Sequence, residues 1–162
     1  MSESYSRQNN ATKAMIDDDI FATGTFKVVR KGIYTEGQRS GQACVSKEFK
    51  SGSVYEDHYF REEMAIINRT QKVIDDWHVE GVINRTILLN TPEIWVYTVS
   101  RRKSLNEPMI ENFEKFNSNS GWADKSGGAW SEVMQALSHF SYHNSSGQFL
   151  LCDLQGGVYS DG

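Results

Sequence analysis

The sequence predicts an α+β fold, in which an antiparallel sheet is combined with one long helix. Apolar and polar residues alternate, as is typical of strands, in residues 21–30, 42–49 and 94–99. Residues 57–77 instead repeat apolar side chains at the spacing of one helical face. Residues 130–156 contain a second helical stripe, then a polar turn and then a short apolar run. The chain is therefore expected to contain helices and strands in one fold.

Length and composition indicate one domain and argue against several classes of protein. A chain of 162 residues, 38% of them hydrophobic, can bury about 70% of its unfolded surface. The net charge is −4 and there is no basic block, which argues against nucleic acid as the principal partner. No apolar run is long enough to cross a membrane, and the N-terminus lacks the apolar core of a signal peptide. Cys44 and Cys152 lie in apolar runs, which favours a reducing, cytoplasmic location over a disulfide framework.

The N-terminal segment and the first strands carry the first candidate site residue. Residues 1–18 are polar and acidic and are expected to form a flexible tail, in which residues 11–15 could be a short helix. The glycine-containing residues 32–41 are expected to connect the first strand to a second strand over residues 42–49. In that strand Lys47 is either an exposed lysine or a lysine that binds a nucleotide phosphate.

The long helix expected at residues 57–77 carries two adjacent glutamates. Asp57 is a plausible N-cap or first-turn acid for this helix. Glu62 and Glu63 either form a solvated face or point to the sheet and pair with Lys47. The sequence leaves both interpretations open.

The next segment is expected to form two further strands. Residues 82–89 and 94–99 have strand character, and Pro92 favours a turn between them. The short basic run at residues 101–104 is interpreted as a solvated loop. A hairpin that ends in an Asn/Ser/Gly turn is the simplest interpretation of residues 113–122.

The C-terminal segment is expected to form a helix, a turn and a buried strand. The helical stripe covers residues 130–140, and residues 149–152 are the apolar run that is interpreted as the strand. Asp153 follows directly, and strand alternation would point Gln155 to the same side. Asp153 is either a turn aspartate or a carboxylate that meets a cation, a metal ion or several donors.

Several ordered motifs resemble those of the alpha-kinases, a family of atypical protein kinases. The sequence SHFSY at residues 138–142, followed by CDLQG at 152–156, is similar to the most specific of them. CVSKEF at residues 44–49 is similar to the family's lysine-bearing strand. The sequences EP at 107–108 and FEKFNSNSG at 113–121 are similar to the segment that passes from the hinge to the second lobe. The family usually has glycine at the position of Asn112, a mild departure because asparagine tolerates left-handed backbone angles.

The resemblance implies a two-lobed fold and ATP-dependent phosphoryl transfer to serine or threonine of a protein substrate. The kinase domain would span residues 19–162, with a first lobe of sheet and long helix at 19–106. A hinge would lie near Glu107, and a partial second lobe would occupy 108–162. The ATP-binding residues implied by the family motifs are Lys47 at a phosphate, Glu107 at the adenine, and Lys115 and Asn119 near the nucleotide.

The resemblance also implies roles for three residues of the second lobe. Asp153 would orient the substrate hydroxyl or accept its proton, and Gln155 would help to hold Mg²⁺. From its spacing alone, His139 is a core histidine; the resemblance makes it one ligand of a structural zinc. Zinc needs four ligands. His143 and Cys152 do not complete such a site, so Zn²⁺ is expected only in a complete domain.

The resemblance does not cover the whole family domain. The Thr-Asp-Pro segment with a magnesium-binding aspartate, a glycine-rich loop and the Cys-x-x-x-Cys zinc ligands are missing, and Asp161 precedes glycine rather than proline. The chain is therefore expected to be C-terminally incomplete and inactive by itself. The alternative is a non-catalytic pseudokinase that binds nucleotide or another protein. Without the resemblance, a small α+β binding domain is the remaining interpretation.

Overall fold

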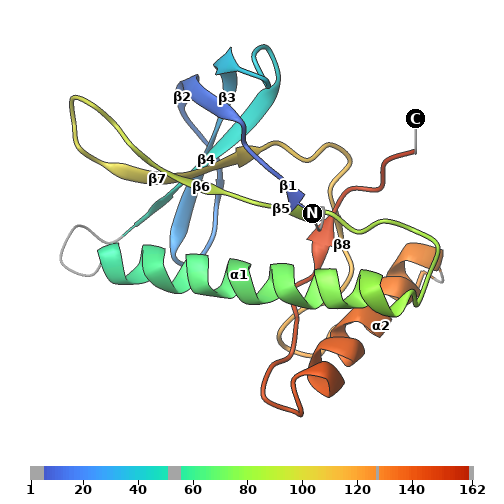
Figure 1. The fold of residues 1–162 in the computed structure, drawn as a ribbon. Helices are drawn as coiled ribbons and strands as arrows, with labels where there is room; N and C mark the ends of the chain where they lie inside the picture. Colours follow the sequence, from blue (N-terminus) through green and yellow to red (C-terminus); the bar gives the residue numbers. More distant parts are fainter. Residues whose placement is uncertain (1–5, 51–55, 127, 161–162) are drawn as a thin grey trace. The chain divides into compact units, whose positions relative to one another are not determined.

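A computed structural model describes residues 6–50, 56–126 and 128–160, and the chain divides into two compact units (Figure 1). The first unit comprises Met1–Gln71 and Thr86–Met109, and the second comprises Lys72–Arg85 and Ile110–Gly162. Each unit is described separately below. Within the described residues, neither helix has the length and apolar character needed to cross a membrane.

The first unit is built on a five-stranded antiparallel sheet with the strand order β2-β3-β4-β7-β6. The expected α+β architecture with an antiparallel sheet is therefore confirmed. A short parallel pair, β1 with β5, accompanies the sheet. The strands are β1 (Ser6–Arg7), β2 (Ala11–Thr23), β3 (Lys27–Gly37), β4 (Ala43–Phe49), β5 (Leu89–Asn90), β6 (Glu93–Val96) and β7 (Lys103–Pro108).

The two faces of the sheet differ in what covers them. The expected alternation in β4 is confirmed, because Cys44, Ser46 and Glu48 are buried whereas Lys47 is half-buried on the opposite face. Helix α1 (Glu56–Glu80) confirms the expected long helix. Its Phe60 packs edge-on against Phe49 of β4, with ring centroids 5.0 Å apart. Aromatic packing therefore holds α1 on the face that carries Lys47.

The opposite face of the sheet buries polar side chains. Glu48 is only 9% exposed, and its carboxylate accepts a hydrogen bond from the Arg102 guanidinium. The Arg30 guanidinium lies 3.7 Å from the same carboxylate. The Ser46 and Tyr97 hydroxyls are hydrogen-bonded at 3.1 Å. Hydrogen bonds and ion pairs therefore compensate for the burial of these groups.

The start of the chain differs from the prediction. Residues 6–7 and 11–18 lie in strands β1 and β2, so the expected tail without regular structure and the short helix at 11–15 are wrong for these residues. Residues 1–5 of the expected tail lie outside the described residues. β2 is an edge strand whose side chains are mostly exposed, so an acidic sequence can form it without burying charge. Pairing with β3 therefore outweighs the tendency of this polar, acidic segment to remain without regular structure.

Two further predictions, for residues 82–89 and 101–104, are wrong. Of the strand expected at residues 82–89, only Leu89 is in a strand. The expected loop at residues 101–104 ends in β7, and Ser104 is fully buried. β7 lies between β4 and β6, but it buries serine and asparagine in addition to Leu105, so its apolar pattern is weak. Because β7 buries polar side chains, its sequence lacks the apolar alternation of a strand, and its first residues were interpreted as part of a loop.

Gly32 is predicted to be essential for the close approach of β2 and β3. It was expected in a turn, but it is buried within β3, and a Cβ atom there would lie 2.5 Å from the Met15 carbonyl oxygen. Gly32→Ala should therefore destabilise the protein by about 1–3 kcal/mol in urea unfolding. Gly24→Ala is the matched control, because the nearest atom to its Cβ would be 3.9 Å away. Equal stability of the two variants would contradict this prediction.

The second unit contains helix α2 (Ala129–Asn144) and the antiparallel pair β8 (Glu114–Lys115) and β9 (Gln155–Gly156). The end of α1 belongs to this unit, where Trp77 packs edge-on against Phe140 of α2 at a centroid distance of 5.4 Å. Leu137 is buried on the same helix. The predicted second helix is thus confirmed, together with its apolar face.

The segment after α2 also differs from the prediction in one respect. The helix ends at the expected polar turn, in which Ser146 and Gly147 have φ angles of 55° and 78°. The buried strand expected at residues 149–152 is wrong. Leu151 is buried, but its N–H donates to the Ser141 hydroxyl of α2 at 2.8 Å rather than to a neighbouring strand. A side-chain acceptor therefore satisfies this backbone group.

Candidate functional site

The first unit brings together two of the predicted site residues, Lys47 and Glu107. β4 and β7 are neighbours, and their register places Val45 opposite Glu107 and Lys47 opposite Leu105. Lys47 and Glu107 are therefore diagonal neighbours on one face. The Lys47 amino group donates a hydrogen bond to the Glu107 carboxylate, so the pair is both ionic and hydrogen-bonded. This pairing was not predicted from the sequence.

Of the two interpretations left open for Glu62 and Glu63, the pairing with Lys47 is not the one that the structure has. The Glu63 carboxylate accepts a hydrogen bond from Lys27 at the start of β3. The Glu62 carboxylate lies 2.9 Å from Nε2 of His58, one helical turn earlier. Glu63 therefore ties α1 to the sheet through a different lysine, and Lys47 takes its partner from within the sheet.

The second unit brings together four more of the predicted site residues. The Asn119 backbone N–H donates to Oδ1 of Asp153 at 3.3 Å, and Nζ of Lys115 lies 3.6 Å from the same oxygen. Lys115 and Gln155 are register partners in the β8–β9 pair. The Asp153 loop thus has one carboxylate and one amine around it, together with the two amide residues Asn119 and Gln155. About half of the Asp153 side chain is exposed, so its oxygens are accessible to a ligand.

Asp153 has an unusual backbone conformation. Its φ angle is 57°, in the left-handed region that asparagine and aspartate tolerate better than most residues. Asp153 lies two residues before β9 and is not part of a strand. The inference from strand alternation that Asp153 and Gln155 point to one side therefore does not apply. The left-handed turn, rather than a strand, determines the direction of the carboxylate.

Asn117 is a further residue of this site that sequence reasoning missed. Its side chain is 6% exposed, and its Nδ2 donates to Gln135 Oε1 at 3.1 Å and to Ser138 Oγ at 3.0 Å. Its Oδ1 accepts the Leu154 N–H at 2.9 Å. Leu154 directly follows Asp153, so Asn117 attaches the Asp153 loop to α2. The Asn-x-Asn spacing at residues 117–119 was the available signal, but only its second member was assigned a role.

The backbone reinforces this attachment. The Phe116 N–H donates to the Leu154 carbonyl at 2.9 Å. Gln135 Nε2 of α2 donates to the Phe116 carbonyl at 2.8 Å. Both chain segments next to Asp153 and Asn119 are therefore held by α2.

The donor atoms near Asp153 are suited to Mg²⁺ rather than to zinc. Mg²⁺ prefers oxygen ligands and commonly combines one or two carboxylates with nucleotide phosphates and water. The Asp153 carboxylate and the Gln155 amide oxygen fit that requirement. His139 and His143 lie next to each other on α2, with ring centroids 4.5 Å apart. Over residues 6–50, 56–126 and 128–160, no three acidic, histidine or cysteine side chains are grouped to hold a metal ion, so these two histidines do not fit a zinc site.

His139 and Cys152 also differ from the sequence interpretation. His139 is exposed on α2, so the interpretation as a core histidine is wrong. Cys152 is exposed, although its apolar neighbours predicted burial. Both side chains are therefore accessible on the surface of the described second unit.

Comparison with known proteins gives one family match. The sequence model of the alpha-kinase family matches residues 22–161. Among individual curated proteins, none matches the chain significantly.

Solved structures with a similar fold are alpha-kinase domains. An alpha kinase from Entamoeba histolytica has a TM-score of 0.70 and 17% sequence identity, over 91% of this chain and 60% of that one. The apoenzyme alpha-kinase domain of myosin-II heavy chain kinase A has a TM-score of 0.61 and 17% identity, over 91% of this chain and 73% of that one. The corresponding domain of myosin heavy chain kinase A in complex with AMP has a TM-score of 0.64 and 17% identity, over 89% and 72%. At this identity the likeness shows the fold.

Proposed function

The chain belongs to the alpha-kinase family, and on that premise we propose that it binds ATP and transfers the terminal phosphoryl group to serine or threonine of a protein. The chain spans 60% of the length of the Entamoeba kinase. The observation that carries the proposal is the accessible Asp153 carboxylate, which is held by the Asn119 N–H beside Lys115.

The proposed role of the second unit is to position the phosphoryl acceptor. Phosphoryl transfer depends mainly on positioning and on stabilisation of charge. Asp153 would accept a hydrogen bond from the substrate hydroxyl and then its proton. Lys115 and Asn119 would lie near the nucleotide, where the Lys115 amine would offset negative charge. Mg²⁺ bound with the nucleotide would neutralise phosphate charge, and Gln155 is the residue that would help to hold it.

The proposed role of the first unit is to bind the nucleotide. Lys47 would exchange part of its interaction with Glu107 for a phosphate oxygen, a favourable partner for an ammonium group. Glu107 would accept a hydrogen bond from the adenine amino group. The ion pair supports both roles, because it holds a donor and an acceptor side by side on β4 and β7. We also propose the two-lobed arrangement with a hinge near Glu107, in a reducing, cytoplasmic compartment.

Calorimetric titration with ATP and Mg²⁺ tests the nucleotide-binding role. Lys47→Ala should weaken ATP binding at least about tenfold, because a hydrogen bond to a charged group contributes about 1.5–3 kcal/mol. Glu107→Ala should weaken binding of ATP but not of inorganic triphosphate, because only ATP carries the adenine. Lys13→Ala is the matched control, since Lys13 forms an exposed pair with Glu36 on the same sheet, at 2.6 Å.

The outcomes of that titration separate the alternatives. Unchanged ATP affinity in Lys47→Ala would contradict the phosphate role of Lys47. ATP binding without transfer of radiolabelled phosphate to protein by a complete domain that contains this chain would instead support a nucleotide-binding module. That the chain is inactive by itself stays a prediction, and turnover in the same transfer assay would contradict it.

A further inference from the structure

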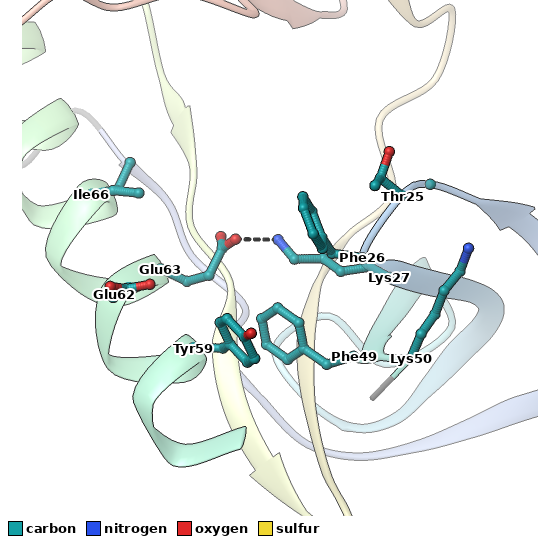
Figure 2. A pocket seen from close by; sticks show the side chains of 10 residues that line it. Thr25, Phe26, Lys27, Phe49, Lys50, Tyr59, Glu62, Glu63 and Ile66 are labelled. Carbon is teal, nitrogen blue, oxygen red and sulfur yellow. Dashed lines mark hydrogen bonds and ion pairs between the residues drawn. The ribbon is translucent and has the colours of Figure 1, made fainter. Parts of the chain in front are cut away.

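The first unit contains a cavity of about 640 Å³ that none of the proposed nucleotide residues line (Figure 2). It lies between the β2–β3 connection, the end of β4 and the first half of α1. Its walls are mainly apolar and aromatic, and charged side chains lie among them. This volume is in the range of cavities that hold small organic ligands, about 300–1,000 Å³.

The apolar walls of the cavity present aromatic surface to solvent. The Phe49 and Tyr59 rings are stacked, with centroids 5.3 Å apart and planes at 28°. Phe26 is 71% exposed and Ile66 is 54% exposed. Aromatic rings favour offset stacking with a further planar ring, and covering apolar surface is favourable. The walls therefore suit a flat aromatic ligand.

The charged side chains of the cavity are not evenly matched. Both carboxylates have a neighbour, because Glu63 is paired with Lys27 and the Glu62 carboxylate lies 2.9 Å from Nε2 of His58. Lys50 is exposed, and its side chain has no partner among the residues that the structure describes. Its backbone N–H donates to the Phe26 carbonyl at 2.9 Å, which fixes the start of this side chain at the cavity. Lys50 is therefore the charged side chain of the described lining that has no hydrogen-bonded or ionic neighbour.

Figure 2 shows how these groups are arranged. The Lys27 amino group and the Glu63 carboxylate point toward each other across the space between β3 and α1. The Lys27 ammonium also lies 5.3 Å from the centre of the Phe49 ring. Lys50 extends away from this pair, so its amino group is available to a ligand at the edge of the cavity.

We propose that this cavity binds a small planar aromatic anion. The aromatic part would stack against the Phe26, Phe49 and Tyr59 rings, and its carboxylate or other acidic group would meet Lys50. Such a ligand would bridge β3, β4 and α1 in the first unit. Because Lys47 precedes Phe49 by two residues in β4, the ligand would contact the end of the strand that carries the proposed nucleotide lysine.

Fluorescence titration with 2-naphthoate tests this proposal, with neutral 2-naphthamide as the comparison ligand. One naphthoate should bind per chain, and naphthamide should bind less tightly. Lys50→Gln should weaken naphthoate binding by up to about fivefold and abolish the preference over the amide. Phe26→Ser should weaken both ligands about tenfold. Phe21→Ser is the matched control, because Phe21 is 53% exposed in the same sheet but does not line the cavity.

Each outcome decides the proposal. Circular dichroism would check that each variant keeps its fold, so that a loss of binding can be attributed to the cavity. Because Phe26 is exposed, its replacement should leave the fold unchanged. Equal affinities for the acid and the amide in the unsubstituted chain, or unchanged binding in Phe26→Ser, would overturn it. Displacement of naphthoate by ATP with Mg²⁺ would also overturn it, because the cavity would then be part of the nucleotide site. Unchanged naphthoate binding in Lys47→Ala would support a site that is independent of the proposed function.

Discussion

Replacing Asp153 with asparagine in a complete kinase domain that contains this chain should lower the rate of phosphoryl transfer at least about 100-fold while ATP affinity stays within about twofold, since general acid–base catalysis contributes about 10²–10⁴-fold. Asparagine retains an oxygen that can accept the Asn119 N–H, and it tolerates the φ angle of 57°. The fold should therefore be preserved. Asparagine cannot accept the proton of the substrate hydroxyl, so only the chemical step should be affected.

Transfer of radiolabelled phosphate and calorimetry with ATP would measure the two quantities separately. Glu132→Gln is the matched control, because Glu132 is an exposed acid of the second unit outside the candidate site. Equal and measurable transfer rates in the Asp153→Asn and unsubstituted complete domains would show that Asp153 is a turn residue only. A parallel loss of ATP affinity would indicate a role in nucleotide binding rather than in transfer.

Replacing Asn117 with alanine should destabilise the protein by about 3 kcal/mol. The substitution removes three hydrogen bonds and leaves Gln135, Ser138 and the Leu154 N–H without this partner in a largely buried place. Each buried group that loses its partner costs about 1–3 kcal/mol, although Gln135 and Ser138 can partly relax. For a chain of this size, the thermal midpoint should fall by about 6–12 °C.

Thermal unfolding followed by circular dichroism would measure this loss. Asn119→Ala is the matched control, because Asn119 is exposed and contacts Asp153 through its backbone N–H, which alanine retains. If both variants unfolded at the same temperature, the attachment of the Asp153 loop to α2 would not depend on the Asn117 side chain.

The sequence predicted the elements whose patterns are local and amphipathic. α1 and α2 have long stripes of apolar residues, and β4 alternates between a buried and a half-buried face, so each signal is contained in one segment. β2 was missed because an exposed edge strand can be acidic, as residues 17–19 show. β7 was missed because Ser104 and Asn106 take buried positions that usually belong to apolar residues. The Ser104 hydroxyl donates to Asn106 Oδ1 at 3.0 Å, a contact within β7 that a search for apolar alternation does not detect.

Prediction of the candidate site was limited in a related way, because contacts between distant segments cannot be inferred from local sequence. The motifs identified Lys115, Asn119, Asp153 and Gln155, and the structure groups these four in the second unit. The contact between Lys47 and Glu107 depends on the register of β4 and β7, and 60 residues of sequence separate the two side chains.

The burial of Glu48 has a consequence for folding specificity. If β7 slipped by two residues along β4, each side chain would keep its face, but Arg102 would move away from Glu48. The Arg102 side chain is 60% exposed and Arg30 would stay near Glu48, so the loss is that of one hydrogen bond to a largely buried carboxylate, about 1.5–3 kcal/mol, and the slipped pairing would be disfavoured. An entirely apolar strand would penalise such a slip far less. The Glu48–Arg102 contact on one face of the sheet therefore acts as a register lock, and the same register sets Glu107 beside Lys47 on the other face.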